Sequence, residues 1–422
     1  MCPSRGAAGK WSATVFVGIE AGPVAGLASR SRGYVDPSYS SGSDTVPGSG
    51  VASETVSVPT VPTCMRAIVL TGHGDLDRLE DRCDVPVPRP QPDEVLVRVS
   101  AAALNNTDIN LRIGWYSAAA GTSDARDAAQ SPKRAEDAGW SGRPVSFPLI
   151  QGADACGSVV AVGRDVPSTR CGQRVLIDPV LRSRPSARGL DTLYLGSDCN
   201  GAFAEYVVVP AINAHPIQTA LSDAELACIP CSFSAAENMI ERAAVRAGET
   251  VLITGASGGV GSAAVQLARR RQANIVALAG SAKADPVSRL GAARVLARDA
   301  DLLAALGPGS VDVVIDVVGG SGFSARLNLL RRGGRYAIAG ALGGARVTVD
   351  LRTVYLHDLH VLGCTLTEVS VFANLVRYLE AGEVRPLLAQ TYPLADIARA
   401  QRDFLEKQHT GKLVLLVGQK PP

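Results

Sequence analysis

The feature that most constrains the fold is a glycine-rich stretch, ITGASGGVGSAAVQLA, which follows an apolar run and precedes a helical pattern. The strand TVLIT is expected to end at Thr254, the turn to span residues 255–259, and a helix to run from Gly259 to about Arg271. Gly258 permits close approach of a pyrophosphate, Gly261 lets helix and strand pack closely, and the helix N-terminus favours negative charge. Such a turn alone could be only a tight connection, but its placement favours nucleotide binding.

Strand and helix patterns alternate from about Ser222 onward. The strand patterns are TVLIT, NIVALA, DVVIDVV and GRYAIAG, and a further helix is expected near Phe323 to Arg331. Alternation of this kind predicts an α/β domain with a doubly wound parallel sheet covered by helices on both faces.

The preceding part, from Met65 to about Pro210, contains short strand patterns separated by turns. They are MRAIVL, EVLVRVSAAA, GSVVAVG, QRVLID and AEYVVVP, and they predict a mostly β domain. Between Gly114 and Pro148 lies a polar insertion that is long for a structureless connection, so we expect a mobile lid or a surface excursion there.

Composition narrows the class of partner. The chain has 422 residues, 46% of them hydrophobic, with 42 basic and 40 acidic residues and no basic block. That balance disfavours a nucleic-acid or anionic-membrane partner and favours a small molecule. No apolar run reaches the ~20 residues that span a bilayer, so no membrane segment is expected.

Nine cysteines are scattered along the chain, which favours reduced thiols in a cytoplasm over a disulfide framework. Cys228 and Cys231 form a Cys-x-x-Cys pattern, typical of a redox pair or half a zinc site. No second pair accompanies it, so we interpret both as small buried apolar residues. Residues 1–64 lack periodicity and are predicted to be a disordered extension upstream of a start at Met65. A transit peptide is disfavoured by Glu20 and the glycines.

The end of the second parallel strand distinguishes between the two nicotinamide nucleotides. NAD binding typically uses a carboxylate there, to bond the ribose hydroxyls. Here the strand runs into Gly280 and Ser281 without an acid, while Ser281 and Lys283 could meet a 2′-phosphate. Lys283 alone could be a solvated helix-start residue, but together with the missing carboxylate it favours NADP.

From Met65 to the C-terminus the chain resembles the medium-chain dehydrogenase/reductase superfamily, especially its zinc-independent quinone-oxidoreductase (zeta-crystallin-like) and enoyl-reductase branch. The motifs that carry the resemblance are NNTDINLRIGWY, GSVVAVG, GAFAEYVVVP, GASGGVGSAAVQLA, DVVIDVVGG, GGRYAIAG and GKLVLL. The resemblance implies a GroES-like catalytic domain (65–221), a Rossmann NADP-binding domain (222–366) and a C-terminal segment (367–422) that returns to the catalytic domain. It also implies a homodimer.

The resemblance also predicts that no metal is bound. Zinc alcohol dehydrogenases of this superfamily place Cys-His-Thr-Asp where this chain has Asn105 to Asp108, and Gly-His-Glu where it has Gly152, Ala153 and Asp154. The third ligand position corresponds to Cys231. Only Cys231 and Asp154 remain where a catalytic zinc needs three protein ligands. The family's structural zinc lobe needs four closely spaced cysteines, and the corresponding region offers only Cys199.

Candidate catalytic residues follow from the branch's pattern Asn-x-x-Asp-x-x-x-Arg-x-Gly-x-Tyr, filled here by Asn105, Asp108, Arg112, Gly114 and Tyr116. Asn105 could donate an amide N–H toward substrate or nicotinamide. Tyr116 could donate a hydrogen bond or proton, or serve only as a cofactor contact. Asp108 and Arg112 are better interpreted as an internal ion pair that fixes the loop than as direct catalysts.

Cofactor positions carry over from the same resemblance. They are Ser257, Gly258, Gly259, Val260 and Gly261 at the phosphates, Gly280, Ser281 and Lys283 at the ribose phosphate, Arg298 beside adenine, and Ile338, Ala339, Gly340, Ala341, Cys364, Thr365 and Leu366 at the nicotinamide. The expected function is an NADPH-dependent reductase that transfers hydride to a quinone or an α,β-unsaturated carbonyl compound. The alternatives are a zinc-dependent alcohol dehydrogenase and a non-catalytic NADPH-binding protein.

Overall fold

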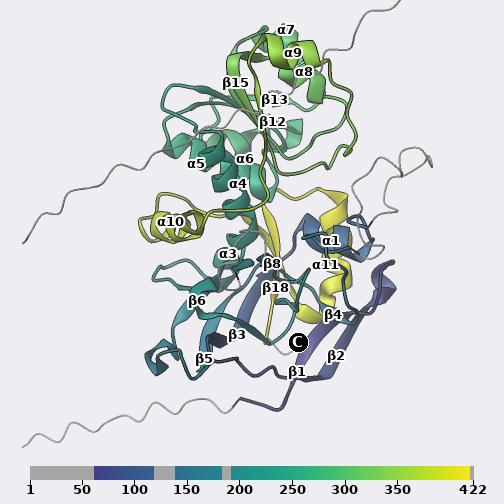
Figure 1. Ribbon diagram of the computed structural model, residues 1–422, viewed down its shortest axis with the longest axis vertical. Coiled ribbons are helices and arrows are strands. Elements are labelled where there is room, and N and C mark those ends of the chain that lie inside the picture. The colour runs from purple at the N-terminus through teal and green to yellow at the C-terminus, as the bar shows by residue number, and fades with distance from the viewer. Residues whose placement is uncertain (1–60, 118–137, 183–191, 419–422) are drawn as a thin grey trace, which may run out of the picture. The chain divides into compact units, whose positions relative to one another are not determined.

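The computed structural model describes residues 61–117, 138–182 and 192–418 (Figure 1). The predicted N-terminal extension up to residue 60 and positions 118–137 of the insertion lie outside the described residues. Within the described ranges, no helix is long and apolar enough to cross a membrane.

The β part is built around a seven-stranded sheet of order β10-β6-β5-β3-β18-β17, with β9 also paired to β3. Its strands are β3 (Glu94–Ala103), β5 (Cys156–Val162), β6 (Arg174–Ile177), β9 (Tyr206–Pro210), β10 (Ala214–Pro216), β17 (Leu388–Pro393) and β18 (Lys412–Leu416). Smaller sheets are formed by β2 (Leu79–Pro86), β1 (Cys64–Leu70) and β4 (Leu149–Ile150), and by β7 (Val180–Arg182) and β8 (Thr192–Tyr194).

The C-terminal end of the chain joins this sheet. Strand β18 runs antiparallel to β3, with Val414 opposite Ala103, and Leu104 N–H donates to Leu413 O at 3.0 Å. In Figure 1 the yellow C-terminal strand lies beside the blue strand β3. This register places Lys412 next to Asn105, although 307 positions separate them in the sequence.

The α/β part contains a six-stranded, all-parallel sheet of order β13-β12-β11-β14-β15-β16. Its strands are β11 (Thr250–Ile253), β12 (Asn274–Ala279), β13 (Arg294–Ala297), β14 (Val311–Asp316), β15 (Leu330–Ile338) and β16 (His360–Gly363). From β11 the chain adds β12 and β13 on one side of the sheet, and then adds β14, β15 and β16 on the other side. The direction in which strands are added therefore reverses between β11 and β14. In doubly wound sheets ligands bind beyond the carboxyl ends of the strands at such a point.

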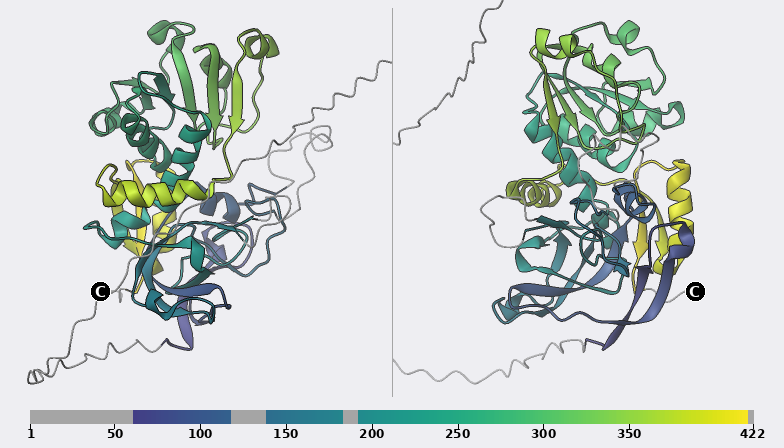
Figure 2. Two further views of the ribbon diagram at one scale, coloured as in Figure 1. Left: turned by 60° about the vertical axis from the view of Figure 1, so that its left-hand side comes forward. Right: turned by 45° about the vertical axis from the view of Figure 1, so that its right-hand side comes forward.

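Helices cover both faces of the parallel sheet (Figure 2). Alternate residues of strand β11 pack in two different cores, one on each face. Val251 and Ile253 pack in one core with α4 (Pro230–Arg242) and α5 (Gly259–Arg270). Leu252 packs in the other core with α8 (Phe323–Leu327). The fold class predicted from the sequence is thus confirmed.

One predicted helix is shorter than expected. The expectation of a helix from Phe323 to Arg331 is wrong at its end, because Leu330 pairs with Val311 as the first residue of β15. Sheet pairing therefore overrides the local helical pattern. The other helices are α1 (Asn106–Arg112), α3 (Asp223–Ala227), α6 (Ala284–Arg289), α7 (Leu302–Leu306), α9 (Leu351–Leu356), α10 (Val369–Glu380) and α11 (Ile397–Glu406).

Candidate active site

The glycine-rich turn has the geometry of a phosphate cradle. Gly255 has a φ of +58°, which favours glycine, and a Cβ on Gly261 would lie 2.2 Å from the Gly255 carbonyl oxygen. By contrast, a Cβ on Gly258 would meet its nearest neighbour only at 3.5 Å, so the space above Gly258 is open. The turn therefore fits a pyrophosphate next to the N-terminus of α5.

The other predicted cofactor residues gather at one edge of the parallel sheet, because each follows the carboxyl end of a strand. Gly280, Ser281 and Lys283 follow β12, Arg298 follows β13, the segment from Ile338 to Ala341 ends β15 and follows it, and the segment from Cys364 to Leu366 follows β16. The structure therefore brings these positions to the edge where the glycine-rich turn follows β11.

Lys283 is anchored by backbone carbonyls, although it is partly exposed. Its Nζ donates to the carbonyl oxygens of Lys407 at 2.5 Å and His409 at 2.7 Å. Burial, and then the positive charge of Arg298, lower the Lys283 pKa. Arg298 itself lies beside Gly280, whose Cβ would come within 3.6 Å of the guanidinium. Two cations thus flank the turn after β12, which fits an anionic ribose substituent.

A buried polar cluster adjoins the glycine-rich turn, and Lys412 lies at its centre. The Lys412 Nζ donates to Asp154 Oδ2 at 2.8 Å and to Asn105 Oδ1, and the Lys412 side chain packs against Gly259. Burial is the largest single influence on the Lys412 pKa and lowers it, but the charge and hydrogen bond of Asp154 together with Cys231 and Cys228 outweigh burial, so the net shift is upward. Lys412 is therefore a charged ammonium, although it is only 4% exposed.

Asn105 faces into this cluster, and its side-chain amide bonds protein groups. Its Nδ2 donates to Asp154 Oδ2 at 2.9 Å and to Ala103 O at 3.3 Å, and its Oδ1 accepts from Lys412. Both amide hydrogens are thereby directed to protein acceptors. The sequence predicted that this amide donates toward substrate or nicotinamide. In the structure, Asn105 instead bonds Asp154 and Lys412 and holds them in place.

Asp108 and Arg112 have separate partners, so their interpretation as an internal ion pair is wrong. The Asp108 carboxylate accepts from the Asn105 backbone N–H at 2.7 Å and caps α1, and burial raises its pKa to about 7. Arg112 instead donates to Gln401 Oε1 at 2.8 Å and to Gly74 O at 2.7 Å. Both residues position the loop, through different neighbours.

The two residues of the Cys-x-x-Cys pattern lie in different environments. Cys228 is fully buried in the apolar core, as predicted. Cys231 is the second residue of α4 and lies beside the polar cluster. Its backbone N–H donates to Asp154 Oδ1 at 2.6 Å, and its Sγ accepts from the Tyr194 hydroxyl at 3.0 Å. The interpretation of Cys231 as a purely apolar residue is therefore wrong.

Tyr116 lies near this cluster. Burial raises its pKa to about 12, while hydrogen bonds from Asn110 and Thr107 act in the opposite direction. The Tyr116 hydroxyl lies close enough to Cys231 and Tyr194 for their ionisation to be coupled. Cys231 raises the pKa of Tyr116, and Tyr116 raises the pKa of Tyr194. A phenol with this pKa is protonated at neutral pH and can donate a hydrogen bond.

The donors at the former ligand positions do not suit zinc. A thiol must lose its proton to bind zinc, yet burial and the Asp154 charge raise the Cys231 pKa to about 12. The Lys412 ammonium already neutralises Asp154 and would repel a dication. No cluster of three or more His, Cys, Asp or Glu side chains suited to a metal occurs in the part of the chain that the structure describes.

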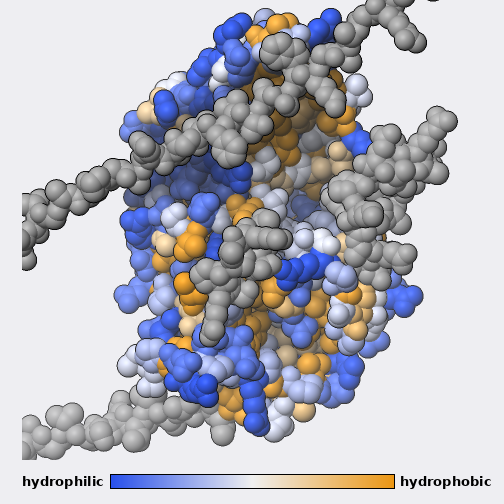
Figure 3. All heavy atoms as spheres, in the orientation of Figure 1, coloured by the Kyte–Doolittle hydropathy of each residue, from blue (hydrophilic) through white to orange (hydrophobic). Residues whose placement is uncertain are grey.

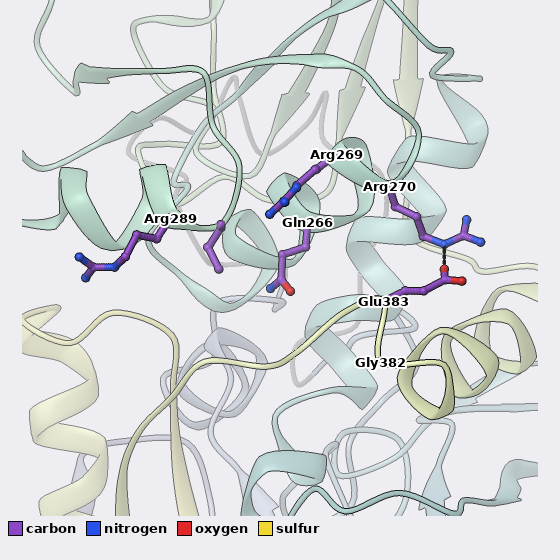
Figure 4. Close-up of a pocket in the computed structure, with 7 residues that line it drawn as sticks. Gln266, Arg269, Arg270, Arg289, Gly382 and Glu383 are labelled. Atoms are coloured by element: carbon purple, nitrogen blue, oxygen red, sulfur yellow. Dashed lines mark hydrogen bonds and ion pairs between the residues drawn. The ribbon is translucent and has the colours of Figure 1, made fainter.

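A separate pocket of about 650 Å³ lies at the other end of α5 (Figure 4). It is lined by Gln266, Arg269, Arg270, Arg289, Leu290, Gly382 and Glu383. Since α5 is 12 residues long, this end is ~18 Å from the glycine-rich turn. Arg269 and Arg270 complement the negative end of the helix dipole, and Arg270 pairs with Glu383. The pocket is therefore not the cofactor site.

Lys412 and Tyr194 are two residues of this site that were not predicted from the sequence. The only signal for Lys412 was its place in the terminal GKLVLL motif, and Tyr194 carried none. Both reach the site through tertiary contacts that local patterns do not encode.

Comparisons with known proteins agree with this architecture. Residues 91–219 match the family model described as alcohol dehydrogenase GroES-like domain, and residues 259–381 match that of zinc-binding dehydrogenase. A solved structure from Sinorhizobium meliloti 1021, described as an alcohol dehydrogenase, is 43% identical with a TM-score of 0.77, covering 85% of this chain and 98% of that one.

Two curated relatives are reductases. The quinone oxidoreductase of Lama guanicoe is 29% identical over 84% of this chain and 98% of its own length. The acryloyl-coenzyme A reductase of Sulfurisphaera tokodaii is 26% identical over 83% of this chain and 99% of its own length. The chain belongs to the medium-chain dehydrogenase/reductase superfamily, in its quinone oxidoreductase branch, and is an oxidoreductase with a nicotinamide cofactor.

Proposed function

We propose that this protein is a metal-independent, NADPH-dependent reductase of quinones or α,β-unsaturated carbonyl compounds. The observation that carries the proposal is the Lys412 ammonium, held by Asn105 and Asp154 next to the glycine-rich turn. A fixed positive charge stands among the positions where related dehydrogenases hold zinc. The names of the two reductase relatives support the acceptor class.

NADPH supplies a hydride when bound, and the chain's own residues provide its position and the surrounding charge. The open space over Gly258 accommodates the pyrophosphate, while Lys283 and Arg298 favour a 2′-phosphate. As negative charge builds up on the acceptor oxygen, the protonated Tyr116 hydroxyl donates a hydrogen bond to it. Lys412 is buried and paired with Asp154, so it holds the polar cluster in a fixed orientation beside the glycine-rich turn.

The deciding experiment is a screen of NADPH oxidation against quinones, enones and aldehydes, with and without a chelator. We expect turnover of quinones or enones that the chelator leaves unchanged. Tyr116→Phe keeps the ring but removes the donor, so kcat and kcat/KM should fall together by ~10²-fold while the Kd for NADPH changes little.

Two outcomes would overturn the proposal. Chelator-sensitive turnover of alcohols or aldehydes, with one zinc per chain, would identify a zinc alcohol dehydrogenase. The match to the zinc-binding dehydrogenase family model is consistent with that alternative. Tight NADPH binding without oxidation by any acceptor would identify a non-catalytic binding protein.

We further propose that the protein is a homodimer. Strand β16 is an edge of the parallel sheet, and large hydrophobic side chains are exposed on and before it. In Figure 3 hydrophobic atoms reach the surface over the region of α7 and α9. An exposed apolar edge of this kind favours pairing with a second copy.

A further inference from the structure

Two aromatic rings are stacked beside the polar cluster. Trp140 and Tyr194 have ring centroids 4.5 Å apart and an interplanar angle of 23°. Tyr194 ends strand β8 and is 5% exposed, whereas Trp140 is only half-buried. The stack therefore presents a rigid inner ring and a partly accessible outer ring.

Asp198 fixes the position of this stack. Its Oδ2 accepts from the Tyr194 backbone N–H at 2.8 Å, and its Oδ1 accepts from the Ser141 hydroxyl at 2.7 Å. The Trp140 backbone N–H donates to Ser197 Oγ at 2.8 Å. One carboxylate thus binds the segments that carry both rings, so the Trp140 ring has a defined place.

The stack is joined both to the polar cluster and to the segment expected at the nicotinamide. The Tyr194 hydroxyl donates to Cys231 Sγ, and the Cys231 N–H donates to Asp154. Trp140, Cys231 and Leu366 pack on one apolar group whose buried members are Ala153, Val180 and Tyr194. Trp140 and Leu366, which belongs to the segment expected at the nicotinamide, therefore pack against the same apolar group.

We propose that Trp140 and Tyr194 form an aromatic wall of the acceptor site, and that Trp140 selects acceptors with fused aromatic rings over small ones. The inference rests on the proposed reductase function. An acceptor whose reactive carbonyl lies at the polar cluster would place additional rings along this wall. Aromatic rings prefer offset stacking or edge contacts with other rings, so a second fused ring gains contact that a small enone lacks.

The test compares 1,4-naphthoquinone, 1,4-benzoquinone and methyl vinyl ketone as acceptors for the wild type, Trp140→Ala and Trp140→Phe. The ratio of variant to wild type is taken for each acceptor, so differences in intrinsic reactivity cancel. For Trp140→Ala we expect kcat/KM to fall about tenfold for naphthoquinone and less than about twofold for methyl vinyl ketone. Trp140→Phe should restore most of the loss, because it keeps a ring.

Binding provides a second measurement. Calorimetry should show weaker binding of naphthoquinone to the NADP⁺-saturated Trp140→Ala protein, with an unchanged Kd for NADP⁺. If removal of the side chain impairs folding, Trp140→Leu retains apolar volume and carries the same expectation. Tyr378→Ala, which removes an aromatic ring packed on Arg270 near the far pocket, is the control and should leave all three acceptors unaffected.

The outcomes separate this inference from the proposed function. If the wild type reduces these acceptors but Trp140→Ala changes all of them equally or none of them, the aromatic wall is refuted and the reductase assignment stands. If the wild type oxidises NADPH with none of the three, the reductase assignment fails and the wall fails with it.

Discussion

At the residue scale, Lys412 has an unusual role because it is a buried charge whose counter-charge, Asp154, is fully buried too. Such pairs add little net stability compared with apolar residues, but removal of one partner leaves the other charge uncompensated. The pair also fixes the Asn105 amide, so Lys412 orients the polar cluster as well as charging it.

We therefore expect Lys412→Met to destabilise the protein by about 3–5 kcal/mol, because Asp154 then remains buried without a counter-charge, held only by hydrogen bonds from Asn105 and Cys231. Thermal or denaturant unfolding would measure the loss. Lys412→Arg keeps the charge and should lose much less. Equal stability of the wild type and Lys412→Met would show that Asp154 does not depend on this ammonium.

Asp108 gives the stability of the protein a pH dependence. Burial raises its pKa to about 7 in the folded chain, against ~3.9 when unfolded. Between these values the folded state holds a proton that the unfolded state has released, so stability falls as pH rises from about 4 to about 7. Asp108→Asn keeps an acceptor for the Asn105 N–H but does not titrate. Its Tm should therefore fall less than that of the wild type between pH 5 and pH 7.5, and parallel curves would contradict this role.

At the element scale, local patterns predicted most strands of both parts, because alternation and apolar runs are properties of short segments. The end of the predicted helix at Phe323 was wrong because pairing of Leu330 with Val311 is a tertiary contact. The polar cluster could not be predicted for the same reason. It depends on the register of β18 against β3, which joins Lys412 to Asn105 across 307 positions.

The turn after β12 carries a prediction about the cofactor. Lys283→Ala should weaken NADPH binding roughly 10- to 100-fold, which is the range expected when a hydrogen bond between charged groups is lost. NADH lacks the 2′-phosphate, so its binding should change by less than about threefold. Fluorescence titration of both nucleotides would measure this. Arg289→Ala, which removes a cation at the far end of α5, is the control and should affect neither nucleotide. Equal losses for NADPH and NADH would show that Lys283 does not bind the additional phosphate.

At the scale of the whole molecule, β16 leaves an edge of the parallel sheet that pairs only with β15 among the described strands. Exposed hydrophobic side chains accumulate over this edge and the segment before it, namely Leu342, Val347, Leu351, Tyr355, Leu356 and Val361. Two copies related by a two-fold axis could pair their β16 strands antiparallel, because such an interface is self-complementary. Pairing would give hydrogen-bond partners to the unpaired backbone N–H and C=O groups of β16 and would also cover the exposed apolar side chains.

Light scattering should accordingly show a dimer for the wild type at micromolar concentration. The double variant Leu351→Glu, Val361→Glu should be a monomer. In a two-fold interface each substitution occurs once on each subunit, so the variant would bury four unpaired carboxylates against apolar side chains, which is costly. Leu405→Glu is the control: Leu405 is also exposed but lies on α11, away from this edge, and its substitution should leave the dimer intact. A monomeric wild type, or a double variant that remains dimeric, would remove β16 as the interface. If the monomeric variant still binds NADPH with the wild-type Kd, the cofactor site is complete within one chain, which is what the contacts between the glycine-rich turn, Lys283 and the C-terminal segment lead us to expect.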